Sequence, residues 1–305
     1  GELFSTTPEG FFYTGTKPIV KLATQEGHTL RLTPNHQVLK VTAQTLKKQY
    51  TEWIAVENLK PRDRVMLHNH QDIRPWDGKG TFEEGWLLGS LVGDGSLTHT
   101  PWNDVGILRY WGETQDELSQ DAATTLEQSV EYTRRTPVAF YHKQHHLRQI
   151  SSSGLAKLAS SFGIICGNKH ITQEIEQGSY NFYQGFLRGL FDADGSVQGT
   201  QLKGVSVRLA QSNLEDLQAV QRMLLRLGIV STLYENRRDK GDRALPDSQR
   251  QPKLYECQAN HEIVITKENL YHFQNIVGFR DPQKNAKLTN ALNSYQRNLN
   301  RERFT

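Results

Sequence analysis

A nine-residue pattern that occurs twice constrains the fold of this chain more than any other feature. It reads LLGSLVGDG from Leu87 to Gly95 and LRGLFDADG from Leu187 to Gly195. Small residues lie four positions apart in each copy, and residues with that spacing share one face of a helix. Each copy therefore predicts a helix with a flat strip that lets another backbone come close. The small residues are Gly89 and Gly93 in the first copy, and Gly189 and Ala193 in the second.

Each copy ends in Asp-Gly. Because a glycine after the last turn is the usual left-handed helix terminator, we expect that conformation at the two glycines and place Asp94 and Asp194 at helix C-termini. The helix dipole disfavours a carboxylate there. If the strips pack together, the two charges also meet, and like charges about 4 Å apart repel by roughly 4 kcal/mol at an effective dielectric near 20. A divalent cation between them explains the pattern most simply; two ordinary buried helices are the alternative.

The chain repeats itself after each copy. Strand 105–112 aligns with strand 204–211, so Arg109 matches Arg208, and a helical run follows each strand. Each half then reads helix, two strands, helix, two strands, helix. The predicted fold class is therefore α+β, with two pseudo-symmetric αββαββα subdomains packed through their motif helices and a small β-rich N-terminal segment. The later strands are expected at 131–135, 139–150, 230–238 and 254–266, and the closing helices at 153–162 and 267–276.

The predicted domain boundaries follow from these patterns. Residues 1–67 read as a β-rich module, and residues 68–85 have the glycine- and proline-containing composition of a linker. The first subdomain is expected at 86–180, and the second, with a C-terminal helix, at 181–305. No apolar run approaches the length of a membrane span, and the two cysteines lack a metal-ligand spacing, so we expect a cytoplasmic protein without a membrane partner.

Basic residues gather on the predicted strands and hairpin tips. Such tips are usually only solvated, but paired β-ribbons on a sheet with one helix-covered face can also enter the major groove of double-stranded DNA. The net charge of +3 permits nucleic-acid binding without requiring it. The candidate DNA-binding residues are Arg109, Arg134, Arg135, Lys143, Arg148, Arg208, Arg237, Arg238, Lys240 and Arg243.

One lysine occurs at a matching place in each half. Lys169 follows Gly163 by six residues, and Lys284 follows Gly278 by six. A lone lysine is usually a solvated side chain, whereas two at the same repeat position indicate a shared role. Lys287 is an alternative to the second.

The two nine-residue copies resemble the motif of the LAGLIDADG homing endonucleases, specifically the intein-encoded type. In that family the eighth motif position is a metal-binding aspartate, which corresponds to Asp94 and Asp194; the sixth is variable and is Asp192 or Val92 here. The segment around Lys169 resembles the family's Lys-x-Ile-Pro block. The resemblance implies that Lys169 and Lys284 lie near the scissile phosphates as catalytic groups.

The N-terminal stretch GHTLRLTPNHQVL resembles the intein block that carries Thr-x-x-His, here Thr33 and His36. Residues 1–67 are accordingly interpreted as a partial intein (Hint-like) module. The splicing nucleophile and a terminal His-Asn do not occur in this sequence, so we expect a structural role for His36.

These features together predict a site-specific double-strand DNA endonuclease that acts as a monomer on a long asymmetric site. Mg²⁺ or Mn²⁺ would be held by the carboxylates of Asp94 and Asp194 and by backbone carbonyls near Gly93 and Ala193, since hard cations prefer oxygen ligands. Two alternatives remain open. One is a cleavage-inactive DNA- or RNA-binding relative of the maturase kind, and the other is a fragment of a protein-splicing intein.

Overall fold

The structure is a computed structural model that describes residues 10, 13, 15–45, 48–70, 75–130, 137–200, 204–246 and 252–294. The chain divides into two compact units, residues 1–73 with 300–305, and residues 74–299. Among the described residues, no helix has the length and apolar character that crossing a membrane requires.

The N-terminal unit is built from short antiparallel strands. One hairpin pairs two strands, and a separate sheet of three strands has the order β4-β3-β5. Its buried hydrophobic side chains, within the described part, are Leu32, Val41 and Val56, so its core is small. The strands are β1 (Val20–Ala23), β2 (Thr29–Leu32), β3 (Gln37–Gln44), β4 (Gln49–Ala55) and β5 (Arg64–Val65).

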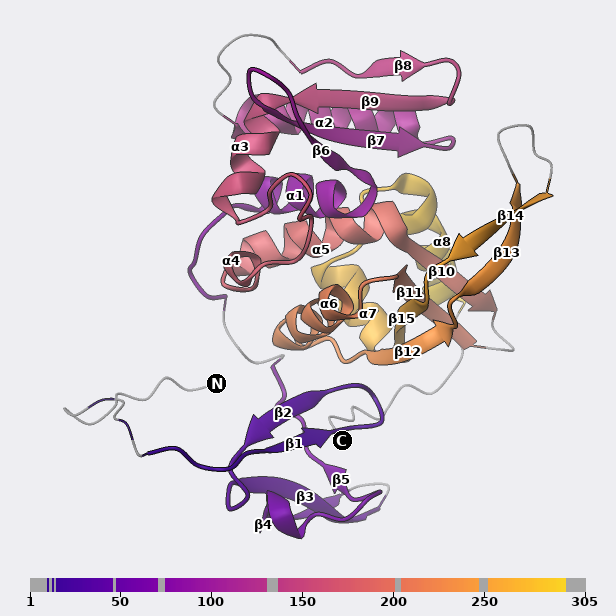
Figure 1. Ribbon diagram of the computed structural model, residues 1–305. Helices are drawn as coiled ribbons and strands as arrows, with labels where there is room; N and C mark the ends of the chain where they lie inside the picture. Colours follow the sequence, from indigo (N-terminus) through magenta and orange to yellow (C-terminus); the bar gives the residue numbers. More distant parts are fainter. Residues whose placement is uncertain are drawn as a thin grey trace. The chain divides into compact units, whose positions relative to one another are not determined.

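The larger unit contains two similar halves, each with a four-stranded antiparallel sheet (Figure 1). The sheet orders are β6-β7-β9-β8 and β10-β11-β15-β12, which confirms the predicted α+β class. The first half comprises α1 (Phe82–Asp94), β6 (Ser96–His99), β7 (Asp104–Trp111), α2 (Gln115–Ser129), β8 (Phe140–His142), β9 (Leu147–Ser152) and α3 (Ser153–Ser161), and α4 (Gln173–Glu176) follows. The second half comprises α5 (Tyr180–Asp194), β10 (Gly195–Thr200), β11 (Gly204–Gln211), α6 (Leu214–Arg226), β12 (Thr232–Arg238), β13 (Gly241–Pro246), β14 (Pro252–Cys257), β15 (Asn260–Thr266), α7 (Asn269–Ile276) and α8 (Pro282–Asn293).

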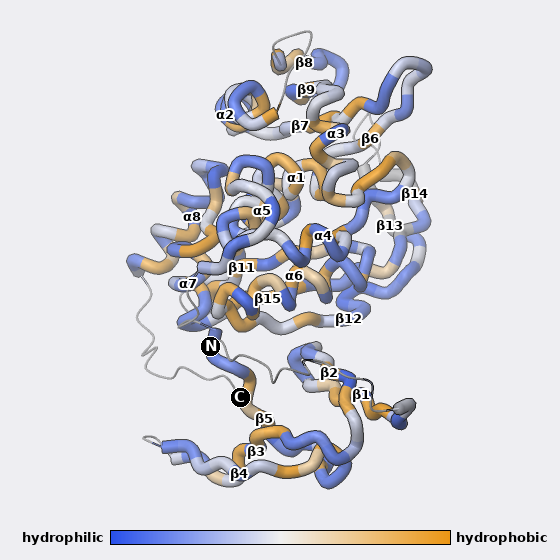
Figure 2. Tube along the Cα trace, turned by 90° about the vertical axis from the view of Figure 1, so that its left-hand side faces the viewer, coloured by the Kyte–Doolittle hydropathy of each residue, from blue (hydrophilic) through white to orange (hydrophobic). Residues whose placement is uncertain are grey.

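Helices α1 and α5 lie side by side at the centre of this unit, where the two halves meet (Figure 1). The predicted strips of small residues form the contact. A Cβ added at Gly89 would lie 2.0 Å from the Phe186 carbonyl oxygen, and one added at Gly189 would lie 2.2 Å from the Trp86 carbonyl oxygen. Gly85 and Gly185 extend the strips by one turn each. Backbone thus packs on backbone, and Figure 2 shows that much of α1, which lies beside α5, is hydrophobic.

A methyl group inside this helix contact should be strongly destabilising. Gly89→Ala would place its Cβ against the backbone of α5, which cannot move aside as a flexible side chain can. We expect a loss of about 1–3 kcal/mol or more in the free energy of unfolding, as for other overpacked cores. Chemical denaturation measures it, with Gly241→Ala as control because nothing lies within 4 Å of a Cβ there. Equal stability of the two variants would contradict the close packing.

The helix ends differ from the prediction in one respect. Both helices stop at the predicted aspartates, but Gly95 and Gly195 have φ values of −87° and −74° and are extended, not left-handed. The chain passes directly into β6 and β10. Glycine is required for space instead, because a Cβ at Gly95 would lie 2.7 Å from the Leu91 oxygen and 2.8 Å from the Ile107 oxygen.

Two long predicted strands are each broken. The stretch 139–150 forms the hairpin of β8 and β9, because the chain turns at 143–146. The stretch 254–266 is divided between β14, which pairs with β13 in a separate two-stranded ribbon, and β15, which belongs to the main sheet. The predicted strand 131–135 lies outside the described residues.

The predicted linker is shorter than expected. Helix α1 begins at Phe82, because Thr81 and Glu84 form a capping box that satisfies the first free amides. Before it, residues 75–81 pack on the start of α5: the Trp76 indole donates to the Gly178 oxygen at 2.9 Å, and Lys79 forms a parallel bridge with Gly178. The described end of the segment is therefore part of the larger unit.

Candidate active site at the ends of the motif helices

Asp94 and Asp194 meet where α1 and α5 end. An added Cβ on Gly93 would lie 2.4 Å from the Ala193 Cβ and 3.4 Å from Asp194 Oδ2, so the two last turns touch. Burial raises the pKa of both carboxyls above the ordinary value, and for Asp94 the neighbouring Asp194 charge raises the pKa further. The packing of the glycine strips thus creates the concentration of negative charge that the sequence predicted.

The two predicted lysines reach the same place. Lys169 Nζ donates to the Gly93 oxygen at 3.0 Å and to the Gly95 oxygen at 2.8 Å. Lys284 Nζ donates to the Phe191 oxygen at 3.3 Å and to the Ala193 oxygen at 3.1 Å. Each ammonium therefore lies against carbonyl oxygens at the end of the motif helix in its own half, among them those of Gly93 and Ala193 in the last turn, where the helix dipole favours a cation.

Burial lowers the pKa of both lysines, and the nearby carboxylates act in the opposite direction. The alternative residue, Lys287, is exposed on the same helix α8. The geometry therefore selects Lys284 as the lysine that lies at the end of α5.

The residues at the helix ends fit a hard divalent cation. Mg²⁺ keeps several waters and binds proteins through one or two carboxylates together with substrate phosphates. Asp94 and Asp194 would supply the carboxylates; within the described residues, no group of three or more His, Cys, Asp or Glu side chains could hold a metal ion. The carbonyls of Gly93 and Ala193 accept from the lysines, and each has a second lone pair. A pocket of about 170 Å³, lined by Asp94, Arg109 and Lys284 among others, opens there.

Two polar residues at this site carried no signal in the sequence. Gln211 Nε2 donates to Asp194 Oδ2 at 3.0 Å, but the aligned position in the first half is Gly112, so the repeat did not point to it. Asp192, at the motif position taken as variable, is buried. It accepts from the Trp86 indole at 3.0 Å and from the Arg280 and Asp281 amides at 2.8 and 3.0 Å. Burial raises its pKa to about 6.

Among the described residues, helices pack against one face of each sheet and leave the other face uncovered. In β7, Leu108 and Tyr110 are buried on the covered side, and Arg109 points to the other side with its guanidinium 3.0 Å from Ser96 Oγ. Arg208 has the matching place in β11 and lies 3.3 Å from Glu262, which also pairs with Arg237 at 3.4 Å. The repeat therefore places Arg109 and Arg208 on equivalent uncovered faces, as their alignment predicts.

The other predicted basic residues divide into three groups. Lys143, Arg238 and Lys240 are exposed at hairpin tips and strand ends of the larger unit, and Arg243 lies on β13. Arg148 lies opposite Tyr110 and so belongs to the helix-covered face, where its guanidinium is 2.6 Å from Asp116 of α2. Arg134 and Arg135 lie outside the described residues. Arg148 is therefore removed from the candidate DNA surface.

Two arginines on opposite faces of one sheet give a controlled test of this surface. Arg109→Gln should lower the slope of log affinity against log salt by about 0.9, the effect of one lost phosphate contact. Arg148→Gln should leave the slope unchanged, because its partner is Asp116. Titration of a fixed DNA duplex over a range of salt concentrations measures both slopes. A reduced slope in the Arg148 variant alone would place the DNA on the other face.

The chain is similar to a protein family, to curated proteins and to solved structures. Residues 181–278 match the family model of the LAGLIDADG-like domain. The chain is similar to the alpha subunit of ribonucleoside-diphosphate reductase NrdEB of Bacillus subtilis, with 24% identity over 269 residues, 82% of this chain and 23% of that protein. It is also similar to the replicative DNA helicase DnaB of Nostoc sp., with 27% identity over 234 residues, 73% of this chain and 25% of that protein. The chain thus spans about a quarter of the length of these relatives.

Among solved structures, a mesophilic variant of the homing endonuclease I-DmoI is similar with 17% identity and a TM-score of 0.43, over 68% of this chain and 97% of that chain. The homing endonuclease I-WcaI bound to its DNA recognition sequence is similar with 15% identity and a TM-score of 0.45, over 76% and 95%. The family model includes the motif helix α5, so the similarity to the LAGLIDADG-like domain lies in the second half of this chain, at residues 181–278.

Proposed function

We propose that this chain is a site-specific DNA endonuclease that hydrolyses one phosphodiester on each strand of a duplex with the help of a divalent metal. The observation that carries the proposal is the pair of carboxylate–lysine constellations at the touching ends of α1 and α5. The constellations cross between the two halves: Lys284 is the lysine that acts most strongly on the charge of Asp94, and Lys169 is the lysine that acts most strongly on the charge of Asp194.

Hydrolysis of a phosphodiester requires an activated water, stabilisation of charge on the phosphorus centre and a supported leaving oxygen. Bound Mg²⁺ or Mn²⁺ would supply all three, because it lowers the pKa of a bound water and stabilises the attacking and leaving oxygens. In this chain Asp94 and Asp194 would hold the metal. Their raised pKa values mark the carboxylates as destabilised when charged and alone, so a cation stabilises the ionised forms. The ammonium groups of Lys169 and Lys284 would neutralise negative charge on the phosphate.

The arrangement of the two halves suits a long and asymmetric DNA site. Both constellations belong to one chain, so a monomer can cut both strands without a partner. Arg109 and Arg208 lie on the uncovered faces of the two sheets, at positions that the pseudo-twofold symmetry relates. The side chains around them differ between the two halves. Different contacts in the two halves favour a target without palindromic symmetry.

The relatives support an intein-encoded origin. They have five different activities by name, namely a reductase subunit, a helicase, a replication factor subunit, a gyrase subunit and RecA. They match 73–93% of this chain, yet the match covers only 14–40% of each of them. A segment shared by proteins of such different activities is expected of an inserted element. The β-rich N-terminal unit, with Thr33 and His36 at the turn before β3, would be its partial Hint-like module.

A cleavage selection tests the proposal and separates it from its alternatives. Supercoiled plasmids with a randomised insert are incubated with the chain and Mg²⁺, and the linear products are sequenced. We expect linearisation at a defined sequence and its loss in the presence of a chelator. Retarded but uncut DNA at every metal concentration would instead favour the cleavage-inactive binding relative.

A further inference from the structure

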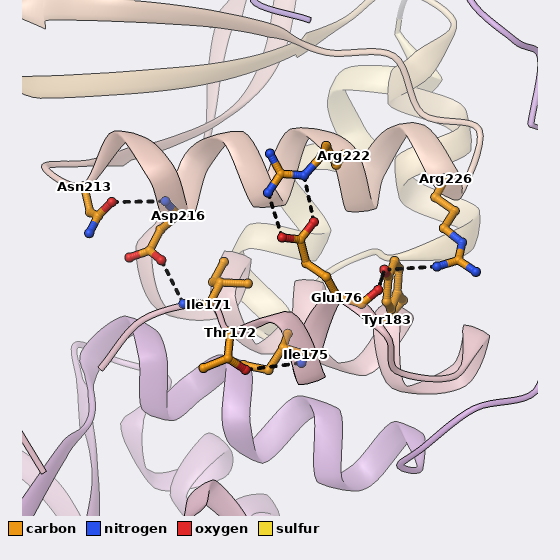
Figure 3. A network of polar contacts seen from close by, with 9 residues as sticks. All are labelled: Ile171, Thr172, Ile175, Glu176, Tyr183, Asn213, Asp216, Arg222 and Arg226. Atoms are coloured by element: carbon orange, nitrogen blue, oxygen red, sulfur yellow. Dashed lines mark hydrogen bonds and ion pairs between the residues drawn. The ribbon is translucent and has the colours of Figure 1, made fainter. Parts of the chain in front are cut away.

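The backbone next to Lys169 is fixed by the other half of the molecule. Asp216, which is buried in the first turn of α6, accepts a hydrogen bond from the Ile171 amide at 2.8 Å (Figure 3). The ring nitrogen Nδ1 of His170 lies 3.1 Å from the other oxygen of the same carboxylate. Helix α6 belongs to the second half, whereas Lys169 donates to a carbonyl at the end of α1, in the first half.

Lys284 shows the reciprocal arrangement. Asp281 accepts from the Lys284 amide at 3.1 Å, and its second oxygen accepts from the Thr114 hydroxyl at 3.1 Å. Thr114 is the residue that precedes α2, in the first half, and its side chain does not cap its own helix. Gln283, the neighbour of Lys284, also donates to Glu113 at 2.6 Å. Helices α2 and α6 are matching elements of the repeat, since each follows the second strand of its half.

We propose that each half of the molecule seats the active-site lysine of the other half. Asp216 positions Lys169 through His170 and Ile171, and Thr114 positions Lys284 through Asp281. Both lysines reach the carbonyls at the helix ends through long, flexible side chains. The position of each ammonium group therefore depends on the position of the backbone that carries the lysine. The inference rests on the proposed function and deepens it: neither constellation is complete unless both halves are docked.

The interface between the two halves also supplies a matched control. Glu176 of α4 forms a bidentate ion pair with Arg222 of α6, with both N–O distances at 2.7 Å (Figure 3). This pair joins the same two segments as the Asp216 contact but does not touch His170 or Ile171. Glu176→Gln therefore weakens the interface without disturbing the seat of Lys169.

The variants preserve the local helix caps. The cap of α6 uses the backbone amide of Asp216, which donates to Asn213 Oδ1 at 3.1 Å. Asp216→Ala therefore removes the carboxylate contacts with His170 and Ile171 but keeps the helix cap. Thr114→Val likewise removes only the contact with Asp281. Asp216→Asn, which retains an acceptor for the Ile171 amide, serves as a conservative variant that should restore much of the rate.

Strand-resolved cleavage at saturating DNA tests the inference on the selected target, with each strand labelled separately. Asp216→Ala should slow the strand that Lys169→Met slows, by on the order of 10- to 100-fold, the usual effect of a small misplacement. Thr114→Val should slow cleavage of the strand whose cleavage Lys284→Met slows. Glu176→Gln should slow cleavage of neither strand. Equal slowing of both strands by Asp216→Ala, or none, would overturn the seating while the proposed function stands. A wild-type chain that cuts neither strand would overturn the proposed function itself.

A second measurement needs neither DNA nor metal. Amide hydrogen exchange should show loss of protection at Ile171 in Asp216→Ala, with the protection of α6 retained and with no change at Ile171 in Glu176→Gln. Unchanged protection at Ile171 in the alanine variant would show that Asp216 does not hold this segment, and would overturn the proposal independently of any cleavage result.

Discussion

Asp94→Asn and Asp194→Asn should each abolish double-strand cleavage while DNA binding is retained. Asparagine keeps the shape of the side chain but removes the charge that would hold the metal. We expect each variant to lose on the order of 100- to 1000-fold or more in the rate of linear product, as when one electrostatic stabiliser is removed from an active site. Gel-shift titration and single-turnover cleavage of the selected target measure the two effects separately.

The same variants should be at least as stable as the wild type without metal. The folded chain raises the pKa of Asp94 and Asp194. At neutral pH, which is above the ordinary pKa of a carboxyl in the unfolded chain, each of these groups therefore destabilises the folded state relative to the unfolded one. Asparagine removes that effect. Thermal unfolding in a chelator checks it, and a large loss of stability would show that lost activity reflects misfolding.

Lys169→Met and Lys284→Met should slow cleavage with little change in affinity. Both ammonium groups lie at the ends of the motif helices, beside the carboxylates, and burial lowers the pKa of each. We expect a reduction on the order of 100-fold in rate, each variant acting mainly on one strand. Lys287→Met, on the same helix but exposed, is the matched control.

Affinity separates the possible roles of these lysines. If the affinity of the Lys169 or Lys284 variant for DNA falls in proportion to its rate, the lysine acts as a phosphate anchor in the bound state, and the assignment as a catalytic group is wrong.

The repeated pattern predicted the parts of the site that both halves share. Residue spacing and the Asp-Gly ends placed Asp94 and Asp194 together, and matched offsets identified Lys169 and Lys284. The structure brings these four residues to the ends of α1 and α5. Helix periodicity and internal repetition can both be read directly from the sequence, without knowledge of contacts between distant segments. Their chemical roles remain proposals.

The features that the sequence did not reveal depend on contacts between distant segments. Gln211 has no counterpart in the first half, and the Asp216 and Thr114 contacts arise only when the halves pack. Arg148 was misplaced because side chains alternate between the two faces of a strand, so an uncertainty of one residue in register changes the face. The glycines after the motif helices were required by crowding and not by their backbone angles.

The central claim is that Asp94 and Asp194 together hold a divalent metal at the touching ends of α1 and α5. The most direct measurement is the amount of Mn²⁺ bound to the DNA complex, counted by electron paramagnetic resonance for the wild type and for the Asp94→Asn, Asp194→Asn double variant on the same duplex. Metal bound by the DNA alone is then common to both samples. The account predicts tightly bound Mn²⁺ in the wild-type complex and its loss in the double variant. Equal binding in the two complexes would contradict it.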